Sequence, residues 1–199
     1  MKSTSACQSR QHHRNHQRGV AAVEFALLAG LFFTVMFGII ELARYTFLRN
    51  TLQEVTRRAA HDAAVADFSD AAALAKVQQS AIFRTTPGQL MLSDNIDDTN
   101  VQIDYLSFAE TAVTPAPSCP AVNASTCIDD PRGARCIRFV RVRICESGTN
   151  CLGVRYVPMV GLLSTLFPSG ANALRLPMAT TITPIQSIKN FSPGTPGCP

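Results

Sequence analysis

The feature that most constrains this chain is an uncharged stretch near its N-terminus. From Phe25 to Ile40, sixteen consecutive residues carry no charge, and Glu24 and Glu41 bound them. Written as a helix, residues 20–40 span roughly 31 Å, at about 1.5 Å per residue. That length matches the hydrocarbon core of a bilayer, which is about 30 Å thick. The sequence therefore predicts one membrane-spanning helix.

Positive charge is concentrated ahead of this stretch. The chain has 18 Lys and Arg against 14 Asp and Glu, a formal net charge of +4. Residues 1–19 hold four of the basic residues and no acidic one, so residues 20–199 carry 14 of each sign and are neutral overall. Because a nucleic-acid-binding protein carries its positive charge on the folded body, we expect no nucleic-acid partner. Residues 1–19 have the composition of a basic leader.

Three kinds of N-terminal segment fit these residues. A cleaved secretory signal has a short apolar core followed by an Ala-x-Ala arrangement, which residues 41–45 lack. An ordinary signal anchor explains the hydrophobicity and leaves Glu24 as an interfacial carboxylate. A charge at the bilayer centre would cost about 2.5–3.5 kcal/mol on insertion scales. A prepilin-type segment explains more, because a cut between Gly19 and Val20 makes Glu24 the fifth residue of the remaining chain.

The residues around this junction resemble the TadE-like family of the tight-adherence (Tad/Flp) pilus assembly system. The resemblance rests on RGVAAVEFALL (residues 18–28), in which Phe25 follows Glu24, and on GIIELARY (38–45) and LQEVTRRAAHDAA (52–64). It covers the N-terminal part of the chain, and the remainder matches only in general layout.

The resemblance implies processing and assembly like those of a pilin. A prepilin peptidase would cut after Gly19 and remove the leader, and the processing site would comprise Arg18, Gly19 and Val20. Glu24, beside Phe25, would then face the new amino terminus of a neighbouring subunit, since opposite charges attract strongly where screening is poor. Major subunits of such pili are much shorter than residues 20–199. The resemblance therefore implies a minor pseudopilin that assembles with other pilus subunits and platform proteins, in a TadE-, TadF- or TadG-like role.

Cysteine placement predicts on which side of the membrane the C-terminal part lies. Counts of Lys and Arg do not decide, because four precede the apolar stretch and four follow it closely. Cys7 lies in the leader, and the six other cysteines are Cys119, Cys127, Cys136, Cys145, Cys151 and Cys198. An even set of this kind indicates two or three disulfides in an oxidising compartment. We therefore expect the C-terminal domain to be extracytoplasmic and the N-terminus cytoplasmic. The resemblance to the TadE-like family implies that the membrane is a bacterial inner membrane and that the C-terminal domain is periplasmic.

Connectivity of the six cysteines stays open, because six allow fifteen pairings. Two pairings would close small loops, Cys145 with Cys151 and Cys119 with Cys127. A zinc site is disfavoured, since no C-x-x-C spacing occurs and His61 is the only histidine after the leader. We expect His61 on a helix surface. No nucleophile elbow, phosphate-binding loop or zinc-protease motif occurs. The sequence thus predicts no enzyme, catalytic residue, metal, cofactor or small-molecule substrate.

Apolar residues continue at helical spacing beyond the membrane segment. They are Tyr45, Leu48, Leu52, Val55, Ala59, Ala63 and Ala66. This stripe predicts packing against the chain's own domain or, as an alternative, contact between subunits. A second helix is predicted over residues 71–84, with Ser69-Asp70 as its N-cap and Pro87-Gly88 after its end.

The C-terminal half shows strand and loop patterns. We expect strands at 101–105, 136–145, 153–157 and 174–185, the last at a sheet edge because it contains Pro177 and Pro184. Loops are expected at 85–100, where acidic residues lack the order of a calcium loop, and at 111–135. Residues 160–167 read as a short apolar helix or loop that packs on the sheet or contacts a membrane or partner. Arginines at 132–143 are expected on a solvated strand face.

The predicted fold class is α+β, with a long N-terminal transmembrane and stalk helix followed by a small disulfide-stapled extracytoplasmic domain. The predicted divisions are a cleaved basic leader (1–19), a transmembrane helix (20–41), a helical stalk (42–84), an α+β cysteine-containing domain (85–191) and a flexible tail (192–199). The alternative function is a single-pass, membrane-anchored binding module that keeps its leader.

Overall fold

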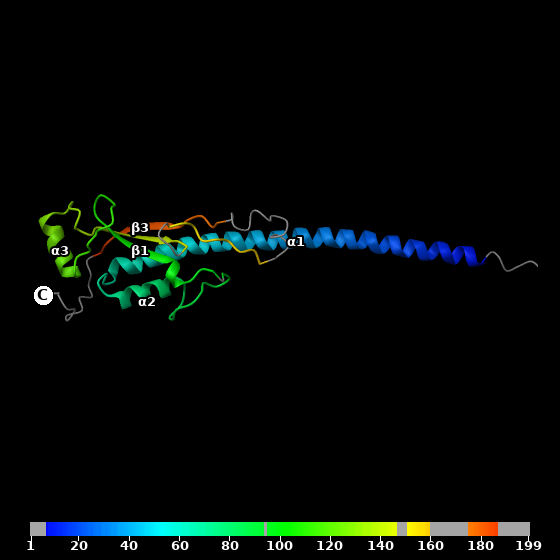
Figure 1. Ribbon diagram of the computed structural model, residues 1–199, viewed down its shortest axis with the longest axis horizontal. Coiled ribbons are helices and arrows are strands. Elements are labelled where there is room, and N and C mark those ends of the chain that lie inside the picture. Colours follow the sequence, from blue (N-terminus) through cyan, green and yellow to red (C-terminus); the bar gives the residue numbers. More distant parts are fainter. Residues whose placement is uncertain (1–6, 94, 147–150, 160–174, 187–199) are drawn as a thin grey trace, which may run out of the picture. The chain divides into compact units, whose positions relative to one another are not determined.

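The computed structural model describes residues 7–93, 95–146, 151–159 and 175–186 (Figure 1). Its elements are α1 (Cys7–Val65), α2 (Ala71–Ala81), the 3-10 helix η1 (Asp98–Asn100), β1 (Val101–Leu106), α3 (Pro120–Asp129), β2 (Phe139–Ile144) and β3 (Thr180–Pro184). The chain divides into two compact units, Met1–Arg44 and Tyr45–Pro199. A long N-terminal helix followed by a small α+β region confirms the predicted fold class.

The first helix, α1, begins earlier than the sequence pattern suggested. It starts at Cys7 rather than near Val20, so the backbone of residues 7–19 is helical. It ends at Val65, next to Ala66, the last residue of the apolar stripe. The Gln and Arg residues that dominate the first turns have good helix propensity, and no proline interrupts the segment.

Tyr45–Val65, the part of α1 within the second unit, supplies the centre of the core. Leu48, Leu52, Val55 and Ala59 are each at most 2% exposed. They share one apolar cluster with buried residues of the sheet, namely Val101, Val140, Val142 and Ile144. The helical stripe therefore packs against the chain's own domain, the first of the two predicted alternatives.

The three strands form an antiparallel sheet in the order β1-β2-β3. Along β2, buried Val140, Val142 and Ile144 alternate with Arg141 and Arg143, so one face of the sheet is apolar. The apolar face meets α1, to which it is also tied by hydrogen bonds. The Tyr105 hydroxyl donates to the Ala63 carbonyl at 3.3 Å, and the hydroxyls of Thr181 and Thr56 lie 3.0 Å apart.

Strand boundaries differ from the predicted ones. Both β2 and β3 are shorter than the predicted strands 136–145 and 174–185, and β3 lies at an edge as its prolines suggested. The predicted strand at 153–157 is wrong, because this segment makes only an isolated bridge between Arg155 and Arg175. One bridge does not provide the repeated backbone hydrogen bonds that define a strand.

The second helix, α2, confirms its predicted start. The Asp70 carboxylate accepts the Ala72 amide at 2.8 Å, as an N-cap should. Its predicted end at residue 84 is wrong, because a Schellman turn stops the helix at Ala81. The amides of Phe83 and Arg84 donate to the carbonyls of Ser80 and Gln79, and Phe83 occupies the left-handed position at φ 62°. Glycine is the usual residue at this position, and because Phe83 occupies it, the sequence carries no signal for the turn.

The third helix, α3, lies where a loop was expected at 111–135, and that prediction is wrong for its middle part. Pro120 stands at the first helical position, which suits a residue without an amide hydrogen. Ser, Thr, Asn and Cys in this helix have weak helix propensity. Tertiary contacts hold it, because the buried Asn123 side chain bonds both the amide and the carbonyl of Ile137.

Residues 160–167 and 192–199, and with them Cys198, lie outside the described residues. The predictions made for them are therefore not compared with the structure.

Candidate functional site in the apolar segment of α1

Residues 20–40 present apolar side chains on all sides of α1. Phe25 is 74% exposed and Leu31 65%, although both are large and apolar. The most apolar window of this helix has a mean hydropathy of 2.2, and none of it is buried inside the protein. A helix that is hydrophobic all round requires an apolar surrounding. The segment is long and apolar enough to cross a membrane, as predicted.

The predicted processing and assembly residues lie within α1. Gly19, Val20, Glu24 and Phe25 are all exposed, and Arg18 belongs to the same helix. Val20 and Glu24 are four residues apart and therefore share a helix face. The carboxylate lies about one turn into the apolar stretch. Their predicted roles stay predictions, which are taken up under the proposed function.

Two disulfides have both of their cysteines among the described residues of the C-terminal part. Cys145 pairs with Cys151, as predicted, and Cys127 pairs with Cys136; the Cα atoms are 4.9 Å apart in each pair. Cys119 is also disulfide-bonded. The predicted pairing of Cys119 with Cys127 is wrong. Eight residues of helix rise separate these two by about 12 Å, too far for a disulfide.

Next to the Cys145–Cys151 disulfide, the Glu146 carboxylate lies between two arginines. Glu146 accepts Arg175 Nη1 at 2.7 Å and lies 3.1 Å from Arg155 Nε. Arg175 also donates to the Gly153 carbonyl at 2.7 Å. The hydrogen bond from Arg175 lowers the pKa of Glu146, and the charges of Arg155 and Arg175 add to this effect. The sequence did not predict this cluster, because Glu146 and Arg175 are 29 positions apart along the chain and are brought together through the isolated bridge between Arg155 and Arg175.

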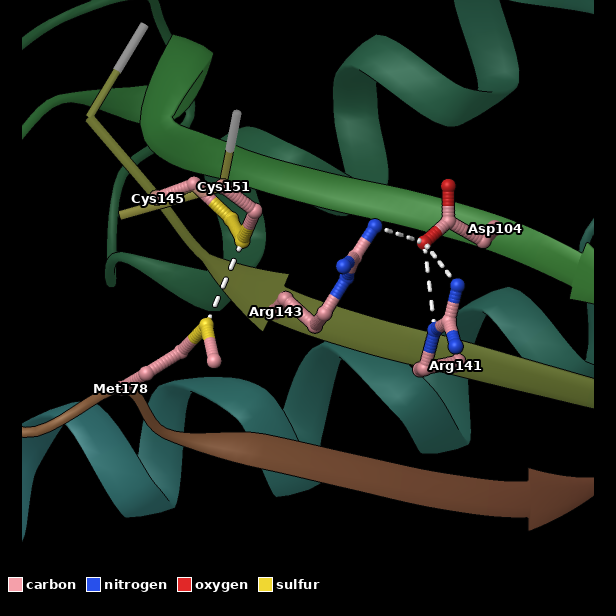
Figure 2. Close-up of polar contacts among 6 residues, drawn as sticks. All are labelled: Asp104, Arg141, Arg143, Cys145, Cys151 and Met178. Carbon is pink, nitrogen blue, oxygen red and sulfur yellow. Dashed lines mark hydrogen bonds and ion pairs between the residues drawn. A yellow bond between two sulfur atoms is a disulfide. The ribbon is translucent and has the colours of Figure 1, made fainter. Parts of the chain in front are cut away.

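A second such cluster occupies the face of the sheet opposite α1. Figure 2 shows Arg141 and Arg143 converging on one carboxylate oxygen of Asp104, at 3.2 and 2.7 Å. Each of these three side chains is about one quarter exposed. Both arginines of β2 therefore form ion pairs with Asp104 of the neighbouring strand β1, and neither stands alone on a solvated face. Nearby, Met178 Sδ lies 3.4 Å from Cys151 Sγ (Figure 2).

Other candidate chemistry is sparse among the described residues. The His61 side chain is 71% exposed, as predicted, and its Nδ1 lies 3.6 Å from Asp62. No group of His, Cys, Asp and Glu that the structure describes is arranged to hold a metal ion. A cleft of about 540 Å³ beside α3 is lined mainly by apolar residues, including Phe108, Ile137 and Phe139. It lacks the several converging polar groups typical of a small-molecule site.

We expect the substitution Glu146→Gln to lower the thermal midpoint modestly at neutral pH, by about 1–3 °C. A lowered pKa means that the ionised carboxylate stabilises the fold above the unfolded pKa of about 4.3. This stabilisation disappears as the pH falls through the lower folded pKa. The difference between wild type and variant should therefore shrink towards pH 3. Thermal melts of the detergent-solubilised chain from pH 7 to pH 3 measure it, with Glu110→Gln as a control. A difference that grows in acid would contradict the expectation.

Comparison with known proteins adds one finding. Residues 19–61 match the model of a family described as TadE-like protein, which confirms the resemblance noted in the sequence. The match covers the apolar segment and the adjoining part of α1, and the sheet, α2 and α3 lie outside it. No curated protein and no solved structure matches the chain.

Proposed function

We propose that this chain, in which residues 19–61 are TadE-like, is a minor pseudopilin that assists assembly of a Tad (Flp) pilus. The observation that carries the proposal is the coincidence of three features in one segment. The family match covers residues 19–61. The exposed apolar segment, residues 20–40, lies within this match, as does the junction between Gly19 and Val20, which precedes Glu24. A TadE-like segment on a helix able to span a membrane fits a Tad pilus-associated membrane protein.

Processing is proposed to occur after Gly19, on the cytoplasmic side of the inner membrane. Glycine is about 1 kcal/mol less favourable than alanine within a helix, so α1 is easier to unwind at Gly19 than at the residues next to it. A prepilin peptidase needs such local unwinding to reach the peptide bond that joins Gly19 to Val20. Cleavage removes the basic leader and leaves an electrically balanced chain.

Assembly is proposed to depend on Glu24. After cleavage the amino group of Val20 becomes a charged terminus at the edge of the apolar segment. The Glu24 carboxylate of one subunit can neutralise that terminus on a neighbouring subunit, which offsets the cost of placing both charges near lipid. The disulfide-stapled domain would stand on the oxidising, extracytoplasmic side, where other pilus subunits and platform proteins meet it.

Leader processing tests the proposal against a simple anchored binding module. We expect the chain isolated from cells with an active prepilin peptidase to begin at Val20 by intact-mass and N-terminal analysis. Gly19→Leu should block the cut and retain residues 1–19. Gly30→Leu is a matched control on the same helix, because a Cβ at Gly19 or at Gly30 meets nothing within 4 Å. A wild-type chain that keeps its leader would support the anchored module instead.

A further inference from the structure

Cys119 is disulfide-bonded, and its partner can be found by elimination. The two disulfides described above use four of the seven cysteines, and Cys119 is not one of the four. Only Cys7 and Cys198 remain within the chain. Cys198 belongs to the same compact unit as Cys119, whereas Cys7 belongs to the other unit. Because a disulfide requires Cα atoms within about 7 Å of each other, Cys198 is the favoured partner.

The burial of Cys119 fits a bonded and covered sulfur. Cys119 is only 1% exposed, although Ser118 directly before it is exposed. It belongs neither to the apolar cluster around α1 nor to the smaller cluster of described residues, Phe68, Val113 and Ile137. Burial outside both clusters is expected where a disulfide partner, and the segment that carries it, cover the cysteine.

The C-terminal segment, residues 187–199, begins at the cleft beside α3. Ile185 and Gln186 line this cleft, as do the first two residues of α3, which directly follow Cys119. The backbone amides of Ile185 and Gln186 donate to carbonyls of the domain at 2.9 and 3.2 Å, so the chain is fixed where it reaches the cleft. Cys198 is twelve residues beyond Gln186, and twelve extended residues reach up to about 40 Å. The segment is therefore long enough to cross the cleft to Cys119.

The composition of this segment suits the cleft. The lining is mainly apolar, and the segment supplies Ile188 and Phe191 with only one charged residue, Lys189. Burial of such side chains in an apolar cleft is favourable, and the three prolines of the segment lower the entropy lost on ordering it. A segment tied to the rim of the cleft is present there at an effective concentration of about millimolar, so it competes well with a separate partner.

We propose that Cys119 and Cys198 form a third disulfide, and that residues 187–197 occupy the cleft beside α3. The bond forms by thiol–disulfide exchange with an oxidised protein disulfide. That disulfide accepts two electrons and the two protons that the Cys119 and Cys198 thiols lose, and it becomes two thiols. The chain itself then fills this cleft, which is closed to small molecules and to other subunits. The inference does not depend on the proposed role in pilus assembly.

Peptide mapping of the full chain tests the disulfide. Expression in cells that lack a prepilin peptidase retains residues 1–19, so both candidate partners are present. The chain is alkylated, unfolded without reductant and cut with trypsin, which cleaves after Lys and Arg. The cysteines in question then lie on three peptides: 3–10 with Cys7, 85–132 with Cys119, and 190–199 with Cys198.

We expect mass spectrometry to find peptide 190–199 bonded to peptide 85–132. Cys119→Ser should release 190–199, while peptide 136–138 stays bonded to 85–132 through the Cys127–Cys136 disulfide. Cys7→Ser is the control and should leave the map unchanged. Peptide 3–10 bonded to 85–132, free 190–199 from the wild-type chain, or a bond found only in covalent dimers would each overturn the pairing.

The absence of tryptophan from the chain allows the cleft to be tested separately. Phe191→Trp places a single tryptophan in the C-terminal segment. We expect acrylamide to quench its fluorescence less in the folded chain than in the chain unfolded by urea, because the ring is buried in the cleft. Ala124→Glu adds a charge to the cleft lining, and in the same background it should raise quenching towards the unfolded level.

Ser125→Glu is the matched control, since Ser125 is the next residue of α3, is exposed and lies outside the cleft lining. It should leave the quenching of Phe191→Trp unchanged. Quenching of Phe191→Trp in the folded chain as strong as in urea would overturn occupation of the cleft. Equal quenching with Ala124→Glu and Ser125→Glu would do the same, even where the disulfide is found.

Discussion

Replacing Glu24 with alanine should reduce pilus assembly at least about ten-fold while leaving membrane insertion intact. The Glu24 carboxylate is exposed about one turn into the apolar part of α1. A charge in that position is costly near lipid, and pairing with an opposite charge offsets this cost. Its removal makes insertion of α1 into lipid easier, because a charged side chain is costly within a bilayer. A loss of assembly can then be assigned to the missing charge rather than to failed insertion.

Two further variants sharpen this test. Glu24→Gln preserves the size of the side chain and removes its charge, so it should assemble as poorly as Glu24→Ala. Glu54→Ala makes the same chemical change at an exposed position of α1 beyond the apolar segment, and it should assemble normally. Counts of surface pili and carbonate extraction of membranes provide the two readouts. Normal piliation with Glu24→Gln would refute the proposed charge pairing.

Features determined by neighbouring residues were predictable from the sequence. The uncharged stretch, the helical stripe from Tyr45 onward and the Asp70 cap depend on residues within a few positions of one another. The alternation of Val140 to Ile144 with arginines likewise encodes a half-buried strand. These patterns sufficed to predict the fold class and the membrane-spanning capacity of α1. The resemblance to the TadE-like family was carried by the same N-terminal residues that the family model matches.

Features determined by distant residues were missed. Asn123 holds α3 by bonding the backbone of Ile137, fourteen positions away, and no local pattern encodes that contact. The missed helix in turn led to the wrong pairing of Cys119 with Cys127, because both were taken as loop residues. The charge clusters show the same limit, since Arg141 and Asp104 are 37 positions apart. A pairing of this kind appears only when the register of two strands is known.

The apolar stripe of α1 supports the largest expected effect on stability, for the substitution Leu52→Ala. Leu52 is 2% exposed within the cluster that joins α1 to the sheet, so truncation leaves a cavity that rigid neighbours on two elements cannot close. We expect a loss of about 2–5 kcal/mol in the free energy of unfolding, measured by urea denaturation of the detergent-solubilised chain with its disulfides intact. Leu152→Ala, at a 52% exposed leucine, is the matched control and should cost less than about 1 kcal/mol. Equal losses for the two variants would mean that α1 is not packed against the sheet, and that its stripe is left to contact other subunits.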